Sequence, residues 1–184
     1  EEAARDRLDA FLDRIAAYAE DRDRPDLPGT SGLSENLTWG EIAPAAVWRA
    51  GMRLREEVGK GAETFLKELA WREFSHHLIF HYPKTPAEPM YDKFARFPWR
   101  EPADYARDLK AWQRGETGIP IVDAGMRQLW QTGIMHNRVR MIVASFLVKD
   151  LWIDWRRRER VFFQRLVDGD PGDADIPLTI ATAP

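Results

Sequence analysis

Apolar residues recur at intervals of three and four positions between residues 4 and 21, a spacing that places them on one face of a helix. A break follows at residues 22–34, where prolines and glycines indicate a loop. The helical spacing returns at residues 44–58, where Pro44 suits the first turn of a helix, and again at residues 62–82. The sequence therefore predicts three helices in its first half. The apolar stripe of the first helix consists of Leu8, Phe11, Leu12, Ile15, Ala16 and Tyr18 or Ala19.

The second half of the chain is also helical in its pattern, after a proline-rich connection that begins at Pro83. Residues 121–133 form a predicted helix that "TGIP" introduces and Gly133 stops. The next predicted helix covers residues 132–155 and the last covers residues 156–170. The sequence shows no long alternation of apolar and polar residues, the pattern that indicates a β-strand, and no internal repeats. The predicted fold class is therefore all-α.

The composition is that of one globular domain. The chain has 184 residues, of which 44% are hydrophobic and 31% are charged, so we expect a single domain over residues 1–184. There is no cysteine, which excludes disulfides and thiolate metal sites and is typical of a reducing, cytoplasmic setting. The longest apolar stretch, at residues 141–148, is far short of the roughly 20 residues that a membrane span needs, so we expect no membrane association.

The charges are unevenly distributed between residue types. The formal net charge is -3, yet 21 of the 27 basic residues are arginine, the side chain that pairs bidentately with phosphates. A coding bias towards arginine explains this equally well. Eight tryptophans are present, and they are candidates for core anchors, stacking platforms or electron carriers.

Two short patterns carry candidate chemistry. "GTSGLS" presents the hydroxyls of Thr30, Ser31 and Ser34 on a glycine-flanked loop, which suits a pyrophosphate, although such a loop is more often a helix cap. His77 and His81 have a spacing that can chelate a metal, but no third ligand follows at useful spacing. We therefore expect no metal, and interpret these histidines, with His76 and His136, as hydrogen-bonded or exposed.

Six motifs occur in series: "TSGLSENLTWGEI", "ELAWREF", "FPW", "TGIPIVDAGMRQLW", "MHNRVRMIVASFLVKDLWIDW" and "LVDGDP". In their order and spacing, from Tyr18 to Asp170, they resemble the photolyase and cryptochrome flavoproteins, specifically the helical FAD-binding domain. The form "MHNRVRM" and "ELAWREF" is similar to class I enzymes that repair cyclobutane pyrimidine dimers. Relatives acting on (6-4) lesions usually carry a second histidine where Asn137 stands.

The resemblance implies FAD as the cofactor. Arg72 would pair with its phosphates, and Arg140 would turn inward to pair with Asp168 beside the isoalloxazine ring. Without a cofactor, Arg72 is interpreted as a surface charge and Tyr18 as a core residue. The implied FAD-contacting residues are Tyr18, Thr30, Ser31, Leu33, Ser34, Phe65, Arg72, Asn137, Arg140, Asp168 and Asp170.

The resemblance also implies a lesion site, a DNA surface and an electron relay. Helical spacing places Glu68 on one face with Trp71 and Arg72, although without the resemblance Glu68 and Arg72 form an ordinary helical ion pair. Trp155 and Trp99 match the middle and outer members of a tryptophan relay, but they are equally interpreted as core anchors. The residues implied for lesion contact are Glu68, Trp71 and Asn137, and those for DNA contact are Arg22, Arg138 and Met141.

Two departures from the family pattern predict a fragment. The amino-terminal α/β domain of the family is missing, and residues 171–184 are an atypical tail in which Ala174 falls where the family's residue faces flavin N5. The inner relay tryptophan would fall near Leu178. We expect light-dependent repair of pyrimidine dimers in damaged DNA by electron transfer from reduced FAD, in a monomer. The alternatives are a cryptochrome-like photosensor and a flavin-free, catalytically silent helical DNA-binding module.

Overall fold

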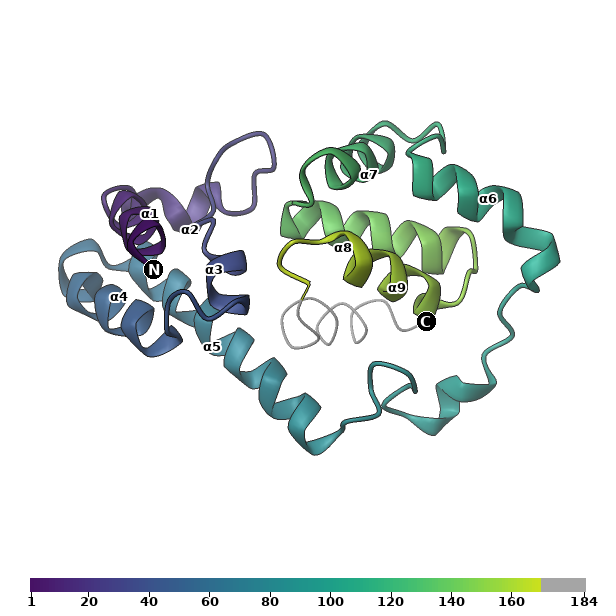
Figure 1. Ribbon diagram of the computed structural model, residues 1–184, viewed down its shortest axis with the longest axis horizontal. Coiled ribbons are helices and arrows are strands. Elements are labelled where there is room, and N and C mark those ends of the chain that lie inside the picture. The colour runs from purple at the N-terminus through teal and green to yellow at the C-terminus, as the bar shows by residue number, and fades with distance from the viewer. Residues whose placement is uncertain (170–184) are drawn as a thin grey trace. The chain divides into compact units, whose positions relative to one another are not determined.

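The computed structural model describes residues 1–169, apart from the side chains of Asp92 and Lys93, and divides the chain into two compact units. Unit 1 is Glu1–Phe74 and unit 2 begins at Ser75, so the division falls within one long helix, α5. Throughout the described residues the regular structure is helical, which confirms the all-α prediction (Figure 1). The prediction of a single domain over residues 1–184 stays a prediction.

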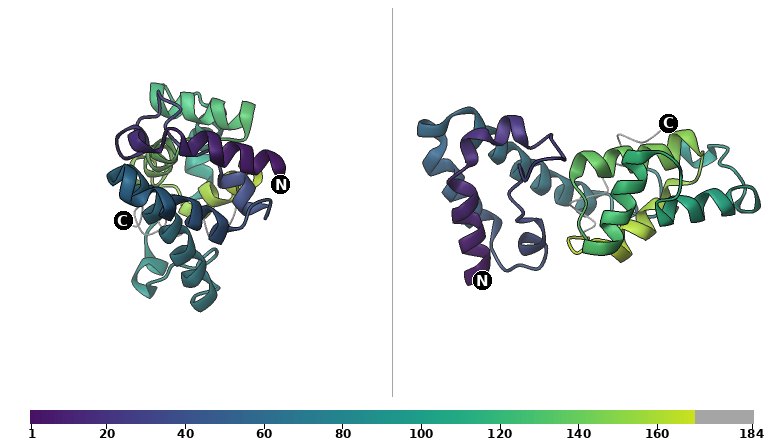
Figure 2. Two further views of the ribbon diagram at one scale, coloured as in Figure 1. Left: turned by 90° about the vertical axis from the view of Figure 1, so that its left-hand side faces the viewer. Right: turned by 90° about the horizontal axis from the view of Figure 1, so that it is seen from above.

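Unit 1 contains α1 (Glu2–Leu12), a 3-10 turn η1 (Ile15–Ala17), α2 (Tyr18–Asp21), α3 (Ser34–Thr38), α4 (Pro44–Val58) and the first part of α5 (Lys60–His81). In its core, Leu8, Phe11, Ile15 and Tyr18 of the predicted stripe pack against α4 and α5, with Leu12 partly buried (Figure 2). Ala16 of the predicted stripe is exposed, because the helix is interrupted before it. The helix predicted over residues 4–21 is interrupted at Asp13 and Arg14, yet Ile15 and Tyr18 stay buried on the far side of the break. Gly61 is required at the crossing, because a Cβ there would lie 2.0 Å from the Ile15 carbonyl oxygen.

Unit 2 contains η2 (Asp92–Arg96), α6 (Pro102–Arg114), α7 (Pro120–Thr132), α8 (Asn137–Ser145), a π-helix η3 (Phe146–Asp150) and α9 (Trp155–Arg165). Its core is centred on Trp112, Met126 and Phe162. α7 packs closely on α8, because at Gly125 an added Cβ would lie 2.5 Å from Val139. Pro120 begins α7 and Gly133, at φ +70°, ends it, as the sequence predicts.

The structure corrects two predictions for unit 2. The connection before "TGIP" was predicted without a helix, but it contains α6, whose buried side Tyr105 and Trp112 occupy. The single helix predicted over residues 132–155 is also wrong. In the structure, α8 begins at Asn137 and is followed by η3. Trp152 then adopts a left-handed φ of 54°, and Asp154 caps α9 by accepting the Arg156 amide at 3.0 Å. The turn buries Ile153, which gives the physical reason for the break.

Candidate functional site

The hydroxyl-rich loop of unit 1 is held by arginines from α1 and the turn after it. Arg7 donates to the Gly32 carbonyl at 3.1 Å and Arg14 donates to the Thr30 carbonyl at 3.0 Å and to the Pro28 carbonyl. Gly32 has a φ of +65°, and the Ser31 hydroxyl accepts the Leu33 amide at 3.4 Å. The loop carbonyls therefore face arginines.

The hydroxyls of this loop remain accessible. Thr30 is exposed, Ser31 and Ser34 are partly exposed, and Leu33 is buried in the core beneath them. Hydroxyls on a loop with a fixed backbone are a donor set suited to phosphate oxygens. The side chains of this loop thus fit the pyrophosphate of FAD.

Tyr18 lies in an aromatic cluster of unit 1. Its ring is 5.3 Å from Phe11 and 5.6 Å from Phe65, both edge-on, and both Tyr18 and Phe65 are buried. Burial is the main reason that the pKa of Tyr18 is raised to about 12; Arg22 opposes this effect, and the charges of Glu68 and Asp23 add to it. Tyr18 therefore keeps its proton at neutral pH. This position agrees with the core interpretation of Tyr18 and leaves its flavin contact a prediction.

Glu68 forms an ion pair with Arg22, whose guanidinium lies 5.7 Å from the Tyr18 ring centroid. The Arg22 side chain is only 15% exposed, while Glu68 is 35% exposed. Burial alone would lower the pKa of Arg22, but the hydrogen bond and charge of Glu68, together with nearby acidic groups, raise it. Glu68, a predicted lesion contact, and Arg22, a predicted DNA contact, are therefore partners in one ion pair.

Arg72 and Trp71 follow on the same helix. Arg72 pairs with Glu73 at 2.9 Å and its side chain is 13% exposed. Glu68 thus has Arg22 as an ion-pair partner and Arg72 has Glu73, while the alternative of an ordinary ion pair between Glu68 and Arg72 stays a prediction. Trp71 is 58% exposed and touches Phe74 edge-on at 5.7 Å, so much of its indole surface faces solvent.

In unit 2, the polar start of α8 is explained by the partners of its side chains. His136 caps the helix by accepting the Arg138 amide through Nδ1 at 3.2 Å. Arg140 turns inward, donates to the Met135 carbonyl at 2.8 Å and pairs with both oxygens of Asp168 at 2.9 and 2.8 Å. The predicted buried pair of Arg140 and Asp168 is confirmed, whereas its contact with the isoalloxazine ring stays a prediction.

The remaining residues predicted at this helix face outward. Asn137 is exposed, and Arg138 and Met141 are half-buried next to each other, with 3.7 Å between the Arg138 guanidinium and the Met141 sulfur. Arg138 lies two positions before the inward Arg140 and therefore on the opposite side of the helix, whereas Asn137, three positions before Arg140, is the first residue of α8. Asp170 of the predicted flavin site lies outside the described residues, as do the atypical tail of residues 171–184 and the positions of Ala174 and Leu178.

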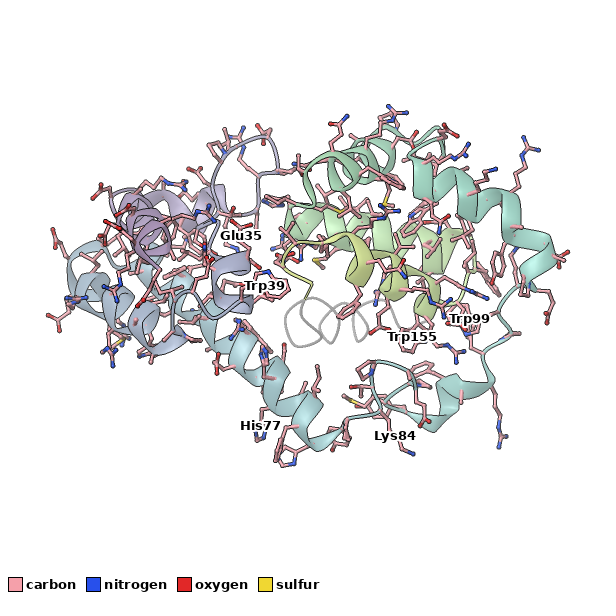
Figure 3. All side chains as sticks on the ribbon, viewed as in Figure 1. Glu35, Trp39, His77, Lys84, Trp99 and Trp155 are labelled. Atoms are coloured by element: carbon pink, nitrogen blue, oxygen red, sulfur yellow. The ribbon has the colours of Figure 1, made fainter. Side chains whose placement is uncertain are left out.

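The two predicted relay tryptophans, which Figure 3 labels, differ in their exposure to solvent. Trp155 is buried at the start of α9, whereas Trp99 is partly exposed and stacks at a tilt on Phe97 at 4.3 Å. The segment after Trp99 is tied to the turn before α9, because Arg100 donates its amide to the Trp152 carbonyl at 3.1 Å. Trp152 does not share a helical face with Trp155, since it lies in the turn.

Sequence reasoning missed Asp123, a buried carboxylate on α7. It accepts the Thr117 amide at 2.7 Å, the Thr117 hydroxyl at 2.6 Å and the Gly118 amide at 2.9 Å. Burial raises its pKa, but these hydrogen bonds outweigh burial and hold the pKa below its usual value. Asp123 thus fixes the "TGIP" turn. The sequence signal that could have identified Asp123 is an acidic residue at a position where the apolar spacing of the predicted helix expects a buried side chain.

His77 and His81 of α5 are neighbours, with 4.4 Å between their ring centroids. The described side chains of residues 1–91 and 94–169 contain no group of three or more potential metal ligands. In the same part of the chain, no helix is long and apolar enough to cross a membrane.

Comparison with known proteins identifies the family of this chain. Residues 65–180 match the family described as "FAD binding domain of DNA photolyase", and the chain belongs to this family, which confirms FAD as the predicted cofactor. A deoxyribodipyrimidine photo-lyase of Agrobacterium fabrum is 53% identical over 93% of this chain and 36% of the relative. That of Escherichia coli is 44% identical over 92% of this chain and 36% of the relative.

Solved structures are similar as well. A bacterial class III photolyase from Agrobacterium tumefaciens aligns with a TM-score of 0.91 and 50% identity, over 97% of this chain and 37% of that one. A cryptochrome from Synechocystis aligns with a TM-score of 0.87 and 32% identity, over 99% of this chain and 38% of that one. The chain thus spans little more than a third of the length of these relatives, and its assignment to class I stays a prediction.

Proposed function

We propose that this chain supplies the FAD- and lesion-binding part of a DNA photolyase that splits cyclobutane pyrimidine dimers in damaged DNA. The observation that carries the proposal is the face of α5 on which Trp71 is 58% exposed, three residues from the partly exposed Glu68. An exposed indole offers a stacking surface for a pyrimidine, and a neighbouring carboxylate accepts hydrogen bonds from it. The names of the relatives support the same activity.

In this proposal each unit has a defined task. In unit 1, the hydroxyls of residues 30–34 and the Arg72 guanidinium hold the FAD phosphates, and Trp71 with Glu68 receives the extruded lesion. In unit 2, Asn137 contacts FAD and lesion, and the Arg140–Asp168 pair contacts FAD. Arg22, Arg138 and Met141 contact DNA. FAD, when bound and reduced, supplies the light absorption and the electron that splits the dimer.

Three further assignments belong to this proposal. Phe65 and Tyr18 line the flavin site from the aromatic cluster of unit 1, and Trp99 and Trp155 carry electrons in unit 2. The chain acts as a monomer in the cytoplasm. No general acid or base is needed, because the residues hold two reactants in contact rather than transfer a proton to either.

A cryptochrome-like photosensor is the second candidate, and it is favoured by the 32% identity to the Synechocystis cryptochrome. The same FAD-binding residues would serve a photosensor. Repair differs from photosensing in its need for Trp71 and Glu68, so the two functions separate in an assay of dimer splitting. The flavin-free DNA-binding module is the third candidate, and it is separated from both by cofactor binding.

The first experiment is an FAD titration of the full 184-residue chain, followed by absorbance spectroscopy of the purified complex. We expect bound flavin bands, and Arg72→Ala should weaken FAD binding by about 1–3 kcal/mol, the range for a lost charged hydrogen-bond partner. A chain that shows no flavin bands after titration would leave the silent DNA-binding module as the explanation.

The second experiment measures repair of a dimer-containing oligonucleotide under blue light with chemically reduced FAD. We expect Trp71→Ala to reduce the rate of splitting strongly while FAD stays bound. Trp48→Ala, which removes a 40% exposed tryptophan from α4, is the matched control and should leave repair unchanged. A chain that binds FAD but splits no dimer would support the photosensor instead.

A further inference from the structure

A cavity of about 580 Å³ lies in unit 2, lined by residues of α6, α7 and α9. Its volume falls within the range of about 300–1,000 Å³ that small-molecule sites occupy. None of its twelve lining residues is among those assigned to FAD, the lesion, DNA or electron transfer. The cavity is therefore a feature that the proposed function leaves unexplained.

The charged residues that line this cavity are all basic. They are Lys110 and Arg114 from α6 and Arg157 and Arg165 from α9, with no aspartate or glutamate among the lining residues. Within residues 1–169 none of these four side chains forms an ion pair. A group of cations that face one cavity without carboxylates attracts an anion. Other arginines of unit 2 do have carboxylate partners, in the pairs Arg100–Asp108, Arg140–Asp168 and Arg156–Asp154.

Two of these arginines are held in place by neighbouring aromatic residues. The Arg165 guanidinium carbon lies 3.5 Å from the ring centroid of Trp130, whose indole N–H donates to the Gln113 carbonyl at 2.7 Å. Arg157 donates its Nε–H to the Tyr105 hydroxyl at 3.2 Å, which leaves its terminal N–H groups for another acceptor. Because the side chains are already positioned, a ligand that binds them loses less conformational entropy.

The cavity is also partly apolar. Leu109 and Val161 belong to the partly buried edge of the unit 2 core, and Trp130 is 52% exposed at the cavity wall. A phosphate ion alone would use only the cations, whereas a ligand with an aromatic ring would also cover the apolar wall and the indole. We propose that this cavity binds an organic phosphate of mononucleotide size, with its phosphate on the arginines and its ring against Trp130 and the apolar wall.

A comparison with unit 1 supports this assignment. Its cavity is larger, about 910 Å³, but its charged residues are mixed: Glu1, Asp9, Asp13 and Glu41 lie there with Arg5 and Arg53, and Arg5 pairs with Glu1 at 2.9 Å. Volume alone therefore does not distinguish the cavity of unit 2. What distinguishes it is the combination of an apolar wall with cations that have no carboxylate partner among the described residues.

The test uses the indole N–H of Trp130 as a reporter inside the cavity, in ¹H–¹⁵N spectra of the full chain. Trp130→Phe identifies the signal, and adenosine monophosphate, adenosine and inorganic phosphate are then titrated separately. We expect saturable shifts with adenosine monophosphate, and binding of either fragment about tenfold weaker or more. Trp130 is not among the residues assigned to FAD, so a shift of this signal reports the cavity rather than the FAD site.

Variants of the exposed arginines complete the test. Arg165→Ala and Arg114→Ala should each weaken adenosine monophosphate binding about tenfold, the factor for roughly 1.4 kcal/mol. Arg160→Ala removes the same charge from α9 outside the cavity and should leave binding unchanged. The proposal is overturned if the Trp130 signal does not move, if inorganic phosphate binds as tightly as the nucleotide, or if Arg160→Ala weakens binding equally. Tighter binding of a single-stranded oligonucleotide than of the mononucleotide at this signal would also overturn it.

Discussion

The buried pair between Arg140 and Asp168 allows a quantitative prediction about the stability of unit 2. The two side chains are 11% and 7% exposed, and one guanidinium nitrogen contacts both carboxylate oxygens at 2.9 and 2.8 Å. Removing one partner of a buried pair costs about 3–5 kcal/mol, because the other charge stays buried without compensation. Asp168→Asn keeps one acceptor oxygen, so we expect the lower end of this range, about 3 kcal/mol.

The matched control is Asp108→Asn in the same unit. Asp108 pairs with Arg100 at 3.0 Å, a similar distance, but the side chains are 34% and 41% exposed. Solvent screens such a pair, and we expect a loss of about 0.2–1 kcal/mol. The two variants remove the same charge, so any difference between them reports burial.

The assay is urea unfolding of the full chain, followed by circular dichroism. With a slope of about 2 kcal/mol per molar urea, Asp168→Asn should lower the midpoint by about 1.5 M, and Asp108→Asn by less than about 0.5 M. Equal shifts in the two variants would refute the reasoning, because burial would then have no influence on the cost of losing the carboxylate charge.

Three further predictions concern packing, pH and salt. Gly125→Ala should destabilise unit 2 by about 1–3 kcal/mol in the same urea assay, because the new Cβ would lie 2.5 Å from Val139; an unchanged midpoint would contradict the close crossing of α7 and α8. The pKa of Tyr18 rises from 10.0 to about 12 on folding. This shift contributes roughly 2–3 kcal/mol to the free energy of unfolding below pH 10, and that contribution is lost as the pH rises to about 12. Tyr18→Phe should flatten the pH dependence of stability in this window, and an identical curve would argue against the buried phenol. Arg138→Ala and Arg22→Ala should each reduce the salt slope of DNA binding by about 0.9, one phosphate's worth, and a parallel slope would exclude that arginine from the DNA contact.

The helices that the sequence predicted well are those whose ends carry strong local signals. α4 begins at Pro44 and ends before Gly59, and its bounds agree with the predicted residues 44–58. α6 was missed because it follows the proline-rich connection and itself begins with Pro102, so that the helical spacing of Tyr105, Leu109 and Trp112 was assigned to the connection. The turn before α9 was missed because a left-handed tryptophan contradicts the local preference of non-glycine residues.

The candidate site was predictable to a different degree. The pairing of Arg140 with Asp168 followed from the family resemblance, since 28 positions separate the two residues and no helical period connects them. The pairing of Arg22 with Glu68 was not anticipated, because local spacing on α5 favoured Arg72 as the partner. Tertiary contacts therefore decided the partners that local spacing left open.

The hydrogen bonds from Arg7 and Arg14 to the carbonyls of the hydroxyl-rich loop at residues 30–34 couple this loop to the first helix of the chain. The loop has few apolar residues of its own, so its order depends on side chains that α1 and the following turn hold in place. Local unfolding in native proteins proceeds in cooperative segments. Opening of α1 would therefore release the loop in the same event, and the hydrogen-exchange rates of the α1 and loop amides would rise together. A segment that resembles an independent surface loop in the sequence thus behaves as part of the amino-terminal helix.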